Sequence, residues 1–461
     1  MRIKLVLPLL FLLIVQSAYG QRRARQTDFV SLINRASAPR IFIDHIVLPA
    51  DSNRSVMSVI FRFDNDFLPF KKISPSDDFE VPAGKEYYVT ARLNSDVFKG
   101  KSKQRGNPEV VSRDAWIDTL FTNTFEETES RKLYASGSLS STLDPGNYYY
   151  VLQLSLMGNP NERNSNRRDV VIPDWTKKET GEIYLMADNL SKNNAVQTEL
   201  PLLNMEDNVP FGKDFFALIR IPDYEPSSEY SIRISKARAN PKDTTKANSV
   251  YEESIDVNDI QTNVLPQLMD GERPVITLKT TSESFTYALV KIPNTTFENS
   301  AYVMEILGNE NKVIAKTFFR SYWPDMPASL YNLDVSLDML KYIVKEEQLK
   351  ELKTGNAKEK EAKFREFWKS KDPTPNTVYN ELMAEYYRRI DYAFKEFGNR
   401  GNLNGQDSDQ GEIYIKFGPP DSKERQFPTN GEVIEIWQYP NRKFVFKAQS
   451  GFGDFKLISA E

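Results

Sequence analysis

Short runs of β-branched and aromatic residues recur from residue 40 to about residue 320, and this pattern constrains the fold more than any other feature of the chain. Phe, Tyr and Trp together make up 12% of the residues, which favours strands because flat side chains pack well on pleated surfaces. The runs predict strands at residues 40–48, 56–63, 86–93, 147–154, 214–221, 229–234, 274–278, 285–292, 302–307 and 313–319. We therefore predict two immunoglobulin-like β-sandwich domains, over residues 38–160 and 175–323, separated by a polar, turn-rich segment.

Two turns add to this expectation. Asp-Pro-Gly at residues 144–146 precedes Tyr148 and a long strand, an order similar to the tyrosine corner of immunoglobulin-like sandwiches. Gly-Asn-Glu-Asn at residues 308–311 supplies the turn that would join the last two strands as a hairpin. Both turns predict the fold and not the function, because sandwich domains serve many unrelated functions.

The hydrophobic period becomes helical beyond the proline-marked junction Trp-Pro-Asp-Met-Pro at residues 323–327. Apolar residues then fall on one helix face, namely Leu337, Leu340, Ile343 and Val344. Asp-Pro-Thr-Pro at residues 372–375 is expected to end a later helix, since neither proline can continue it. Asn376 would cap the next helix, and Gly398 would suit its end.

Three further strands are predicted after this helix, at residues 412–417, 433–438 and 443–446. A tight turn at residues 439–442 would join the last two strands. Residues 328–461 are therefore predicted to form an α+β domain, with helices first and a small antiparallel sheet after them.

The N-terminus has the features of a secretory signal peptide. Arg2 and Lys4 supply positive charge, residues 5–15 are apolar, and Ala18 and Gly20 fit the small-residue cleavage site. A membrane anchor is the alternative, but the apolar run is shorter than the roughly 20 residues that span a bilayer. We predict a signal peptide at residues 1–20 and a polar tether at residues 21–37. No transmembrane segment is expected in the mature chain.

Composition narrows the possible chemistry. The formal charge is −4, and removal of residues 1–20 takes away only positive charge, so the mature chain has no general attraction to nucleic acid. There is no cysteine, which excludes disulfides, thiolate metal sites and cysteine nucleophiles. We expect neither a nucleic-acid partner nor a cofactor, and no metal site.

Histidine occurs once, at His45, which limits both catalysis and metal binding. A serine–histidine–aspartate triad could use only this residue, and a site with several histidine ligands is excluded. His45 lies in the apolar, β-branched run of residues 40–48, so we interpret it as a structural strand residue.

The C-terminal quarter carries an ordered set of motifs. They are Phe-Trp at residues 367–368, Asp-Pro-Thr-Pro at 372–375, Tyr-Tyr-Arg-Arg at 386–389, Gly-Gln-Asp-Ser-Asp-Gln-Gly at 405–411, Gly-Pro-Pro-Asp at 418–421, and Glu-Ile-Trp-Gln-Tyr at 435–439. Together with the junction at 323–327, the set resembles the GWxTD family over roughly residues 323–447. That family has no established activity, and many of its members place β domains ahead of this module.

The family's naming motif is degenerate here. Gln406, Ser408 and Gln410 stand where the family has tryptophan, threonine and arginine, while both glycines and Asp409 remain. If the motif is a site, tryptophan and arginine contacts are lost; if it is a turn, Asp409 would cap backbone N–H groups and Gly411 would take positive φ. The candidate binding residues that the resemblance implies are Gly405, Ser408, Asp409, Gly411, Gly418, Pro420, Asp421 and Trp437.

The same region contains residues that could bind calcium, hydrolyse a glycosidic bond or stack on sugars. Asp407, Asp409 and Gly411 have the spacing that begins a calcium loop, but Gly418 occupies the position of the required glutamate. Carboxylates on or beside the predicted sheet could serve glycoside hydrolysis without histidine, namely Asp409, Glu412, Asp421 and Glu435. Strand tyrosines and tryptophans could stack on sugars, although many of them should face a core.

We therefore expect an exported, non-catalytic protein-interaction or scaffold component at the periplasmic or extracellular face of a bacterial envelope, with an envelope protein as its partner. An envelope polysaccharide-binding protein is the first alternative. A carboxylate-dependent hydrolase is the second.

Overall fold

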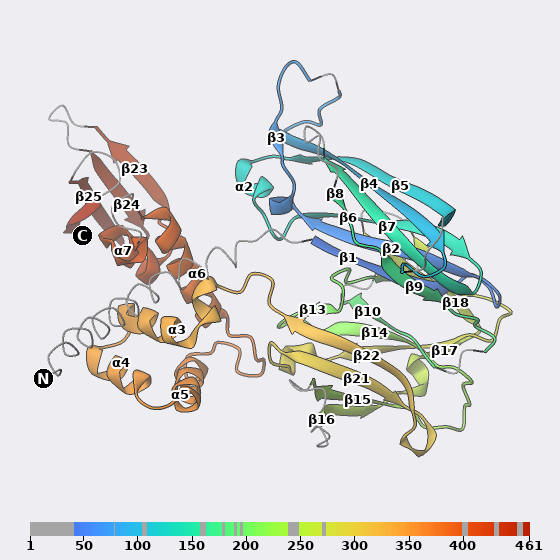
Figure 1. Ribbon diagram of the computed structural model, residues 1–461. Coiled ribbons are helices and arrows are strands. Elements are labelled where there is room, and N and C mark those ends of the chain that lie inside the picture. Colours follow the sequence, from blue (N-terminus) through green and yellow to red (C-terminus); the bar gives the residue numbers. More distant parts are fainter. Residues whose placement is uncertain are drawn as a thin grey trace, which may run out of the picture. The chain divides into compact units, whose positions relative to one another are not determined.

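The computed structural model describes residues 41–77, 79–103, 108–156, 163–177, 180–188, 191–193, 197–237, 249–269, 273–398, 404–427, 433–449 and 455–461. The predicted signal peptide and tether lie outside these residues. The chain is mostly β-sheet, with a C-terminal helical region followed by a small antiparallel sheet. It divides into two compact units, a β unit at Pro39–Pro324 and a C-terminal unit that includes Asp325–Glu461 (Figure 1). The division falls inside the proline-marked junction.

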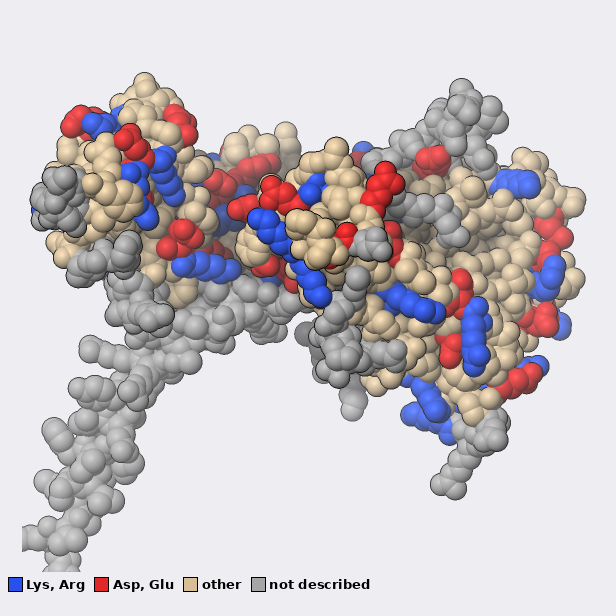
Figure 2. All heavy atoms as spheres, turned by 90° about the horizontal axis from the view of Figure 1, so that it is seen from above, with Lys and Arg blue, Asp and Glu red and all other residues tan. Residues whose placement is uncertain are grey.

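Charged side chains of both signs are interspersed on the face seen in Figure 2. This distribution agrees with the small formal charge of −4 and differs from the single-sign stripe of a nucleic-acid-binding surface. Across the described ranges, no helix is both long and apolar enough to cross a membrane.

The first β region (residues 41–172) is sandwich-like, with two sheets around one core. One sheet has the order β1 (Ile41–Pro49), β2 (Ser55–Asp64), β6 (Tyr134–Leu143). The other contains β3 (Lys71–Lys72), β4 (Tyr87–Lys99), β5 (Glu109–Thr122), β7 (Gly146–Leu156), β8 (Arg163–Asn164) and β9 (Arg168–Ile172). Alternate side chains of both sheets, including Phe61, Phe63, Leu93 and Tyr150, fill the space between them.

The second β region (residues 183–322) contains three sheets. The first is ordered β10 (Ile183–Ala187), β14 (Phe215–Arg220), β20 (Thr286–Ile292), β17 (Ile260–Thr262). The second is ordered β11 (Ser191–Asn193), β12 (Gln197–Pro201), β19 (Val275–Thr280), β18 (Val264–Met269). The third is ordered β13 (Asn208–Pro210), β22 (Val313–Tyr322), β21 (Ala301–Leu307), β15 (Ser231–Lys236), β16 (Ser249–Ser254).

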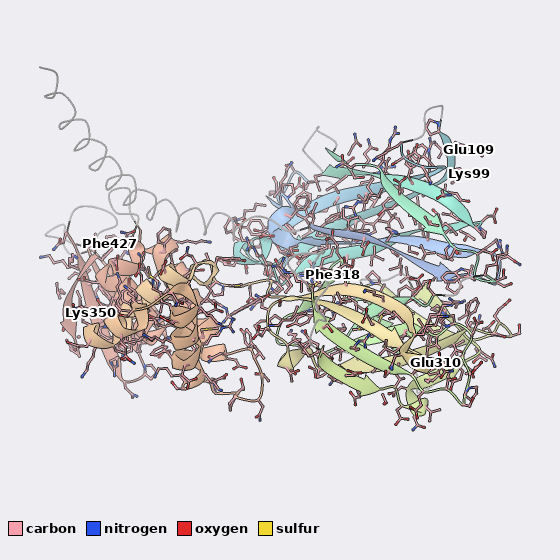
Figure 3. The ribbon with its side chains drawn as sticks, turned by 60° about the horizontal axis from the view of Figure 1, so that its bottom comes forward. Lys99, Glu109, Glu310, Phe318, Lys350 and Phe427 are labelled. Atoms are coloured by element: carbon pink, nitrogen blue, oxygen red, sulfur yellow. The ribbon has the colours of Figure 1, made fainter. Side chains whose placement is uncertain are left out.

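The sequence located β1, β2, β4 and β7 of the first region and the hairpin of β21 and β22 in the second, but it missed the long strands β5 and β6. Glu310 lies in the turn of this hairpin with φ 56°, within the segment predicted to form it (Figure 3). Each region also has a tyrosine whose hydroxyl bonds to a carbonyl four residues earlier. Tyr148 donates to the Asp144 carbonyl at 3.1 Å, and Tyr302 donates to the Glu298 carbonyl at 3.0 Å.

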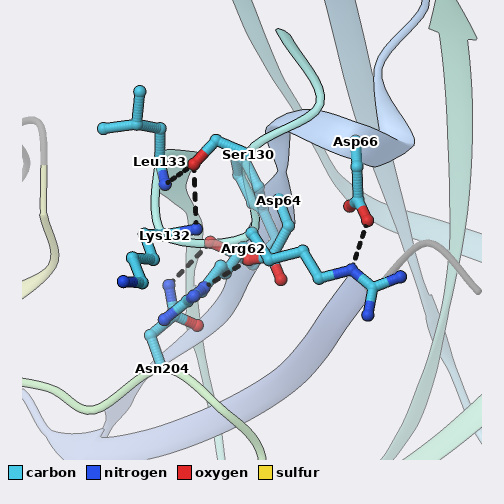
Figure 4. Close-up of polar contacts among 9 residues, drawn as sticks. Arg62, Asp64, Asp66, Ser130, Lys132, Leu133 and Asn204 are labelled. Carbon is cyan, nitrogen blue, oxygen red and sulfur yellow. Dashed lines mark hydrogen bonds and ion pairs between the residues drawn. The ribbon is translucent and has the colours of Figure 1, made fainter. Parts of the chain in front are cut away.

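The two β regions share a core. Leu48 and Ile60 of the first region pack in one cluster with Tyr184 and Met186 of the second. Polar contacts reinforce this junction: Asn204 Nδ2 donates to the Phe61 carbonyl at 2.6 Å, close to the Arg62–Asp64 ion pair (Figure 4). The β regions therefore pack against one another as a single compact unit.

The C-terminal unit begins with helices and ends with a four-stranded sheet. Its helices are α3 (Leu333–Met339), α4 (Glu346–Lys353), α5 (Ala357–Lys369), α6 (Glu381–Glu396) and α7 (Asp409–Phe417). The sheet is an antiparallel meander of β23 (Ser422–Gln426), β24 (Ile434–Tyr439), β25 (Arg442–Ala448) and β26 (Phe455–Ala460). Trp368, Tyr386 and Tyr387 pack in the helical core, and Trp437, Phe444 and Phe446 in the core of the sheet.

Two sequence predictions in this unit are wrong. Residues 412–417 belong to α7 and are not a strand. Ile413 packs in the sheet core and Ile415 in the helical core, so burial on two sides of one helix produced the alternation that suggested a strand. The cap of α6 is Asn380, whose side chain accepts from the Met383 N–H at 2.8 Å, and not Asn376.

Candidate functional site

The two glycines of the naming motif allow a close approach of three elements. Gly405 begins a short 3₁₀ helix, and a Cβ placed there would lie 2.3 Å from the Ala393 carbonyl oxygen of α6. A Cβ on Gly411 would lie 2.1 Å from the Gly405 carbonyl oxygen. The motif can therefore lie directly on α6 only if both positions are glycine. Gly411 is helical, so the prediction that it takes positive φ is wrong.

Ser408 begins α7. Its Oγ accepts from the Gly411 N–H at 3.0 Å and donates to the Gly405 carbonyl at 2.6 Å. Ser408 is thus the helix cap, and the prediction that Asp409 performs this role is wrong. Asp409 instead joins the helix to β26, because its carboxylate accepts from the Leu457 N–H at 2.8 Å and lies 3.5 Å from the Lys456 amine.

A buried carboxylate lies beneath α7. Glu435 of β24 is 6% exposed, and its Oε1 accepts from Gln410 Nε2 at 2.9 Å and from Trp437 Nε1 at 2.7 Å. Its Oε2 accepts from Arg425 Nε at 3.0 Å. Gln410 is the residue that replaces the family's arginine, so this position still bonds to Glu435. The cluster joins α7, β23 and β24, and the sequence gave no signal that these residues meet.

Trp437 is fully buried, with 0% exposure, and the Lys423 amine lies 4.8 Å from the centre of its ring system. Because successive strand residues point to opposite faces, Glu435, Trp437 and Tyr439 all face α7. Trp437 therefore acts first as a core residue, and a binding role for it stays a prediction.

The second motif forms the chain reversal from α7 to β23. Gly418 ends the helix with φ 80°, and a Cβ there would lie 2.9 Å from Arg389 Nη2. Its carbonyl accepts from the Tyr439 hydroxyl at 2.8 Å. Pro420 is partly buried, and exposed Asp421 donates its N–H to the Gln438 carbonyl at 2.8 Å. Gly418 and Asp421 thus tie the reversal to β24, and Pro420 lies between them.

Gln406, which replaces the family's tryptophan, is 3% exposed. Its side-chain oxygen has no hydrogen-bond partner within the part of the chain that the structure describes. A buried amide oxygen without a partner destabilises a fold by roughly 1–3 kcal/mol. The substitution therefore leaves a local weakness under the motif.

Asp407 and Asp409 are held by different elements. Asp407 accepts from the Tyr342 hydroxyl at 2.7 Å and pairs with the Lys341 amine. Burial and the bond to Asp407 raise the pKa of the Tyr342 hydroxyl well above its usual value. Within the described ranges, no group of three acidic or histidine side chains is arranged to hold a metal ion.

The comparison with known families agrees with this geometry. Residues 300–456 match the model of the GWxTD domain. The resemblance found in the sequence is thus confirmed for the C-terminal region. The match begins at the β21–β22 hairpin, so it includes the end of the β unit as well as the C-terminal unit. No curated protein matches the chain.

The GWxTD motif region therefore holds its polar side chains in internal contacts. Glu435 receives three donors, Asp409 contacts β26, and Glu412 pairs with Lys416 one turn along α7. This arrangement positions α7 between the helices and the sheet.

Proposed function

We propose that the protein is a non-catalytic interaction component of a bacterial envelope, and that its GWxTD domain binds a partner protein through the outer face of the four-stranded sheet. The two β regions would be immunoglobulin-like spacers or docking faces, and residues 1–20 would direct export. The observation that carries the proposal is the contrast between the two faces of this sheet.

The inner face is packed against α7, while the outer face presents partly exposed apolar residues. Ile436 and Val445 are directly opposite each other on β24 and β25, and both point away from Trp437. Ile434 lies on the same face, and Ile458 of β26 is more than half exposed. Apolar side chains gathered in this way are typical of protein interaction surfaces.

Catalysis is less well supported because the candidate carboxylates are separately engaged. A general acid and base need room for substrate between them, whereas Glu435 is buried under three donors. Hydrolysis by the purified chain, abolished by Asp409→Asn in a folded variant, would support the hydrolase alternative instead.

One feature favours the glycan-binding alternative. Tyr392 of α6 is 40% exposed and stacks on Tyr414 of α7 with ring centroids 4.5 Å apart. A flat exposed aromatic surface can stack on sugar rings. Binding of cell-wall glycans that is lost in Tyr392→Ala would establish this role.

The main proposal is tested by charging the outer face. Ile436→Lys with Val445→Lys should abolish co-purification of a stoichiometric partner from envelope extract. Ile117→Lys is the matched control, because Ile117 of β5 is 59% exposed in the β unit. Retention of the same partner by the double variant, or retention of glycans with no protein partner, would contradict the proposal.

A further inference from the structure

A buried arginine in the β unit has no carboxylate partner among the residues that the structure describes. Arg220, the last residue of β14, is 6% exposed, and within the described ranges it forms no ion pair. The one hydrogen bond that its side chain makes to a described residue is a long contact of 3.4 Å from Nη1 to the Thr180 carbonyl. Two arginines elsewhere in this unit that are more exposed than Arg220 do pair, Arg62 with Asp64 and Arg131 with Asp66.

Two aromatic rings border the guanidinium. Its central carbon lies 5.0 Å from the centre of Trp175 and 5.6 Å from the centre of Phe285. Such cation–π contacts stabilise a buried cation by less than its removal from water costs. Among the described residues, the rings and one long hydrogen bond therefore leave most of the five N–H donors of Arg220 without compensation.

Arg220 lines a pocket of about 570 Å³. Pockets for small ligands are commonly about 300–1,000 Å³ and often lie where domains meet. This pocket combines Ser52 from the β1–β2 loop, Trp175 from the connection between the β regions, and Phe285 beside β20. Its aromatic wall is held in place, because Trp175 Nε1 donates to Ser55 Oγ at 2.9 Å and the two rings meet edge to face at 6.3 Å.

The charged side chains that line the pocket indicate which kind of anion could bind to Arg220. Asp223 and Glu283 also line it, together with Lys177, so its positive and negative side chains balance. A doubly charged phosphate would be repelled by the two carboxylates. A single carboxylate suits the planar fork of a guanidinium, which it can bind through two parallel hydrogen bonds.

We propose that this pocket binds a small monocarboxylate carried on an apolar or ring-shaped body, with the carboxylate on Arg220 and the body against Trp175 and Phe285. The hydroxyl groups of Thr176, Ser284 and Thr286 line the same space and can bond to polar groups on the ligand. Because the pocket draws on both β regions, the ligand also stabilises their junction. This inference is independent of the partner surface proposed for the GWxTD domain.

Calorimetry on the purified chain tests the proposal with three acids and their neutral counterparts. The pairs are benzoate with benzamide, indole-3-acetate with indole-3-acetamide, and glucuronate with glucose. At least one acid should bind saturably and about tenfold or more tightly than its neutral partner, since the ion-paired hydrogen bonds would be lost. Equal binding within all three pairs, no binding of any acid, or tighter binding of inorganic phosphate would overturn the proposal.

Variants locate the site. Arg220→Met, which keeps the apolar volume, should weaken the bound acid about tenfold or more, and Arg220→Lys should weaken it less. Arg113→Gln is the control for general charge, because that side chain of β5 is 71% exposed and does not line the pocket, so affinity should stay within about twofold. Ser284→Trp blocks the exposed mouth of the pocket and should abolish binding even if Arg220→Met does not fold. Wild-type affinity in Ser284→Trp would overturn the proposal.

Discussion

One buried charge in the β unit and one in the C-terminal unit are held in opposite ways. Glu435 in the C-terminal unit receives hydrogen bonds from three side chains, whereas Arg220 in the β unit has one long bond and two aromatic neighbours. A buried charge with a full set of partners stabilises a particular arrangement of elements. A buried charge with too few partners beside a pocket is free to bind a ligand. By this comparison, we infer a structural role for the motif region, and the β-unit pocket is the candidate site.

The largest effect is expected from Glu435→Ala, which leaves Gln410, Trp437 and Arg425 without their shared acceptor. Removal of one member of a buried charged network lowers the free energy of unfolding by about 3–5 kcal/mol. The C-terminal unit should therefore unfold at a much lower urea concentration. Urea unfolding followed by tryptophan fluorescence measures the change. Glu412→Gln is the control: its pair with Lys416 is exposed, and its loss should cost less than about 0.5 kcal/mol. Equal losses in the two variants would contradict a structural role for Glu435.

Next in size is Gly411→Ala. The added Cβ would meet the Gly405 carbonyl oxygen at 2.1 Å, a backbone atom that cannot move without displacing α7. Forcing extra volume into such a contact costs roughly 1–3 kcal/mol. Gly84→Ala is a useful comparison, because that glycine has φ 79° but nothing within 4 Å of its Cβ position. If the Gly84 variant loses as much stability, the close approach of α7 to the Gly405 carbonyl is not what requires glycine at 411.

The two units also differ in how much of them the sequence predicted. Several strands of the β unit are rich in β-branched and aromatic residues, so β2, β4, β7, β14 and β20 were located from the sequence. In the C-terminal unit α7 is buried on two sides, and its apolar spacing suggested a strand. β23 was missed because every one of its residues is exposed and polar, so only its pairing with β24 makes it a strand.

The site shows the same limit. The resemblance to the GWxTD family located the glycines and Asp409, yet the cluster at Glu435 depends on contacts between residues 10 and 25 positions apart. The pocket at Arg220 was not predicted at all. Arg220 lies at the end of a predicted strand, where many arginines are solvated, and its burial depends on Trp175 and Phe285, which lie far from it in the chain.

A smaller effect, of opposite sign, is expected at Gln406. Gln406→Met keeps the side-chain length and removes the buried amide oxygen that has no partner among the described residues. The variant should be about 1 kcal/mol more stable than the natural chain. Thermal unfolding of the two proteins gives the comparison. A loss of stability would mean that the amide makes a contact through water that the apolar side chain cannot replace.

The smallest effect concerns the pH dependence of the β unit. His45 contacts the Tyr150 hydroxyl at 3.3 Å, and burial lowers its pKa below 6.5, with Asp44 acting in the opposite direction. Below pH 6.5 the unfolded chain therefore binds a proton that the folded chain does not bind. Stability should fall as the pH drops from 6.5 towards the lowered pKa of the folded state.

The chain offers a direct test because it contains a single histidine. The urea midpoint of the natural chain should fall between about pH 8 and about pH 5.5 by more than that of His45→Gln. Asp207, which lines the same pocket as His45, has a pKa raised by burial and by Asp44 and Glu206, so its contribution has the opposite slope. The contribution of Asp207 to the pH dependence of stability lies at pH values above 3.8 and is the same in both proteins. The difference between the natural chain and His45→Gln therefore reports His45 alone. Equal falls in the two midpoints would show that the imidazole is as easily protonated in the folded chain as in the unfolded one.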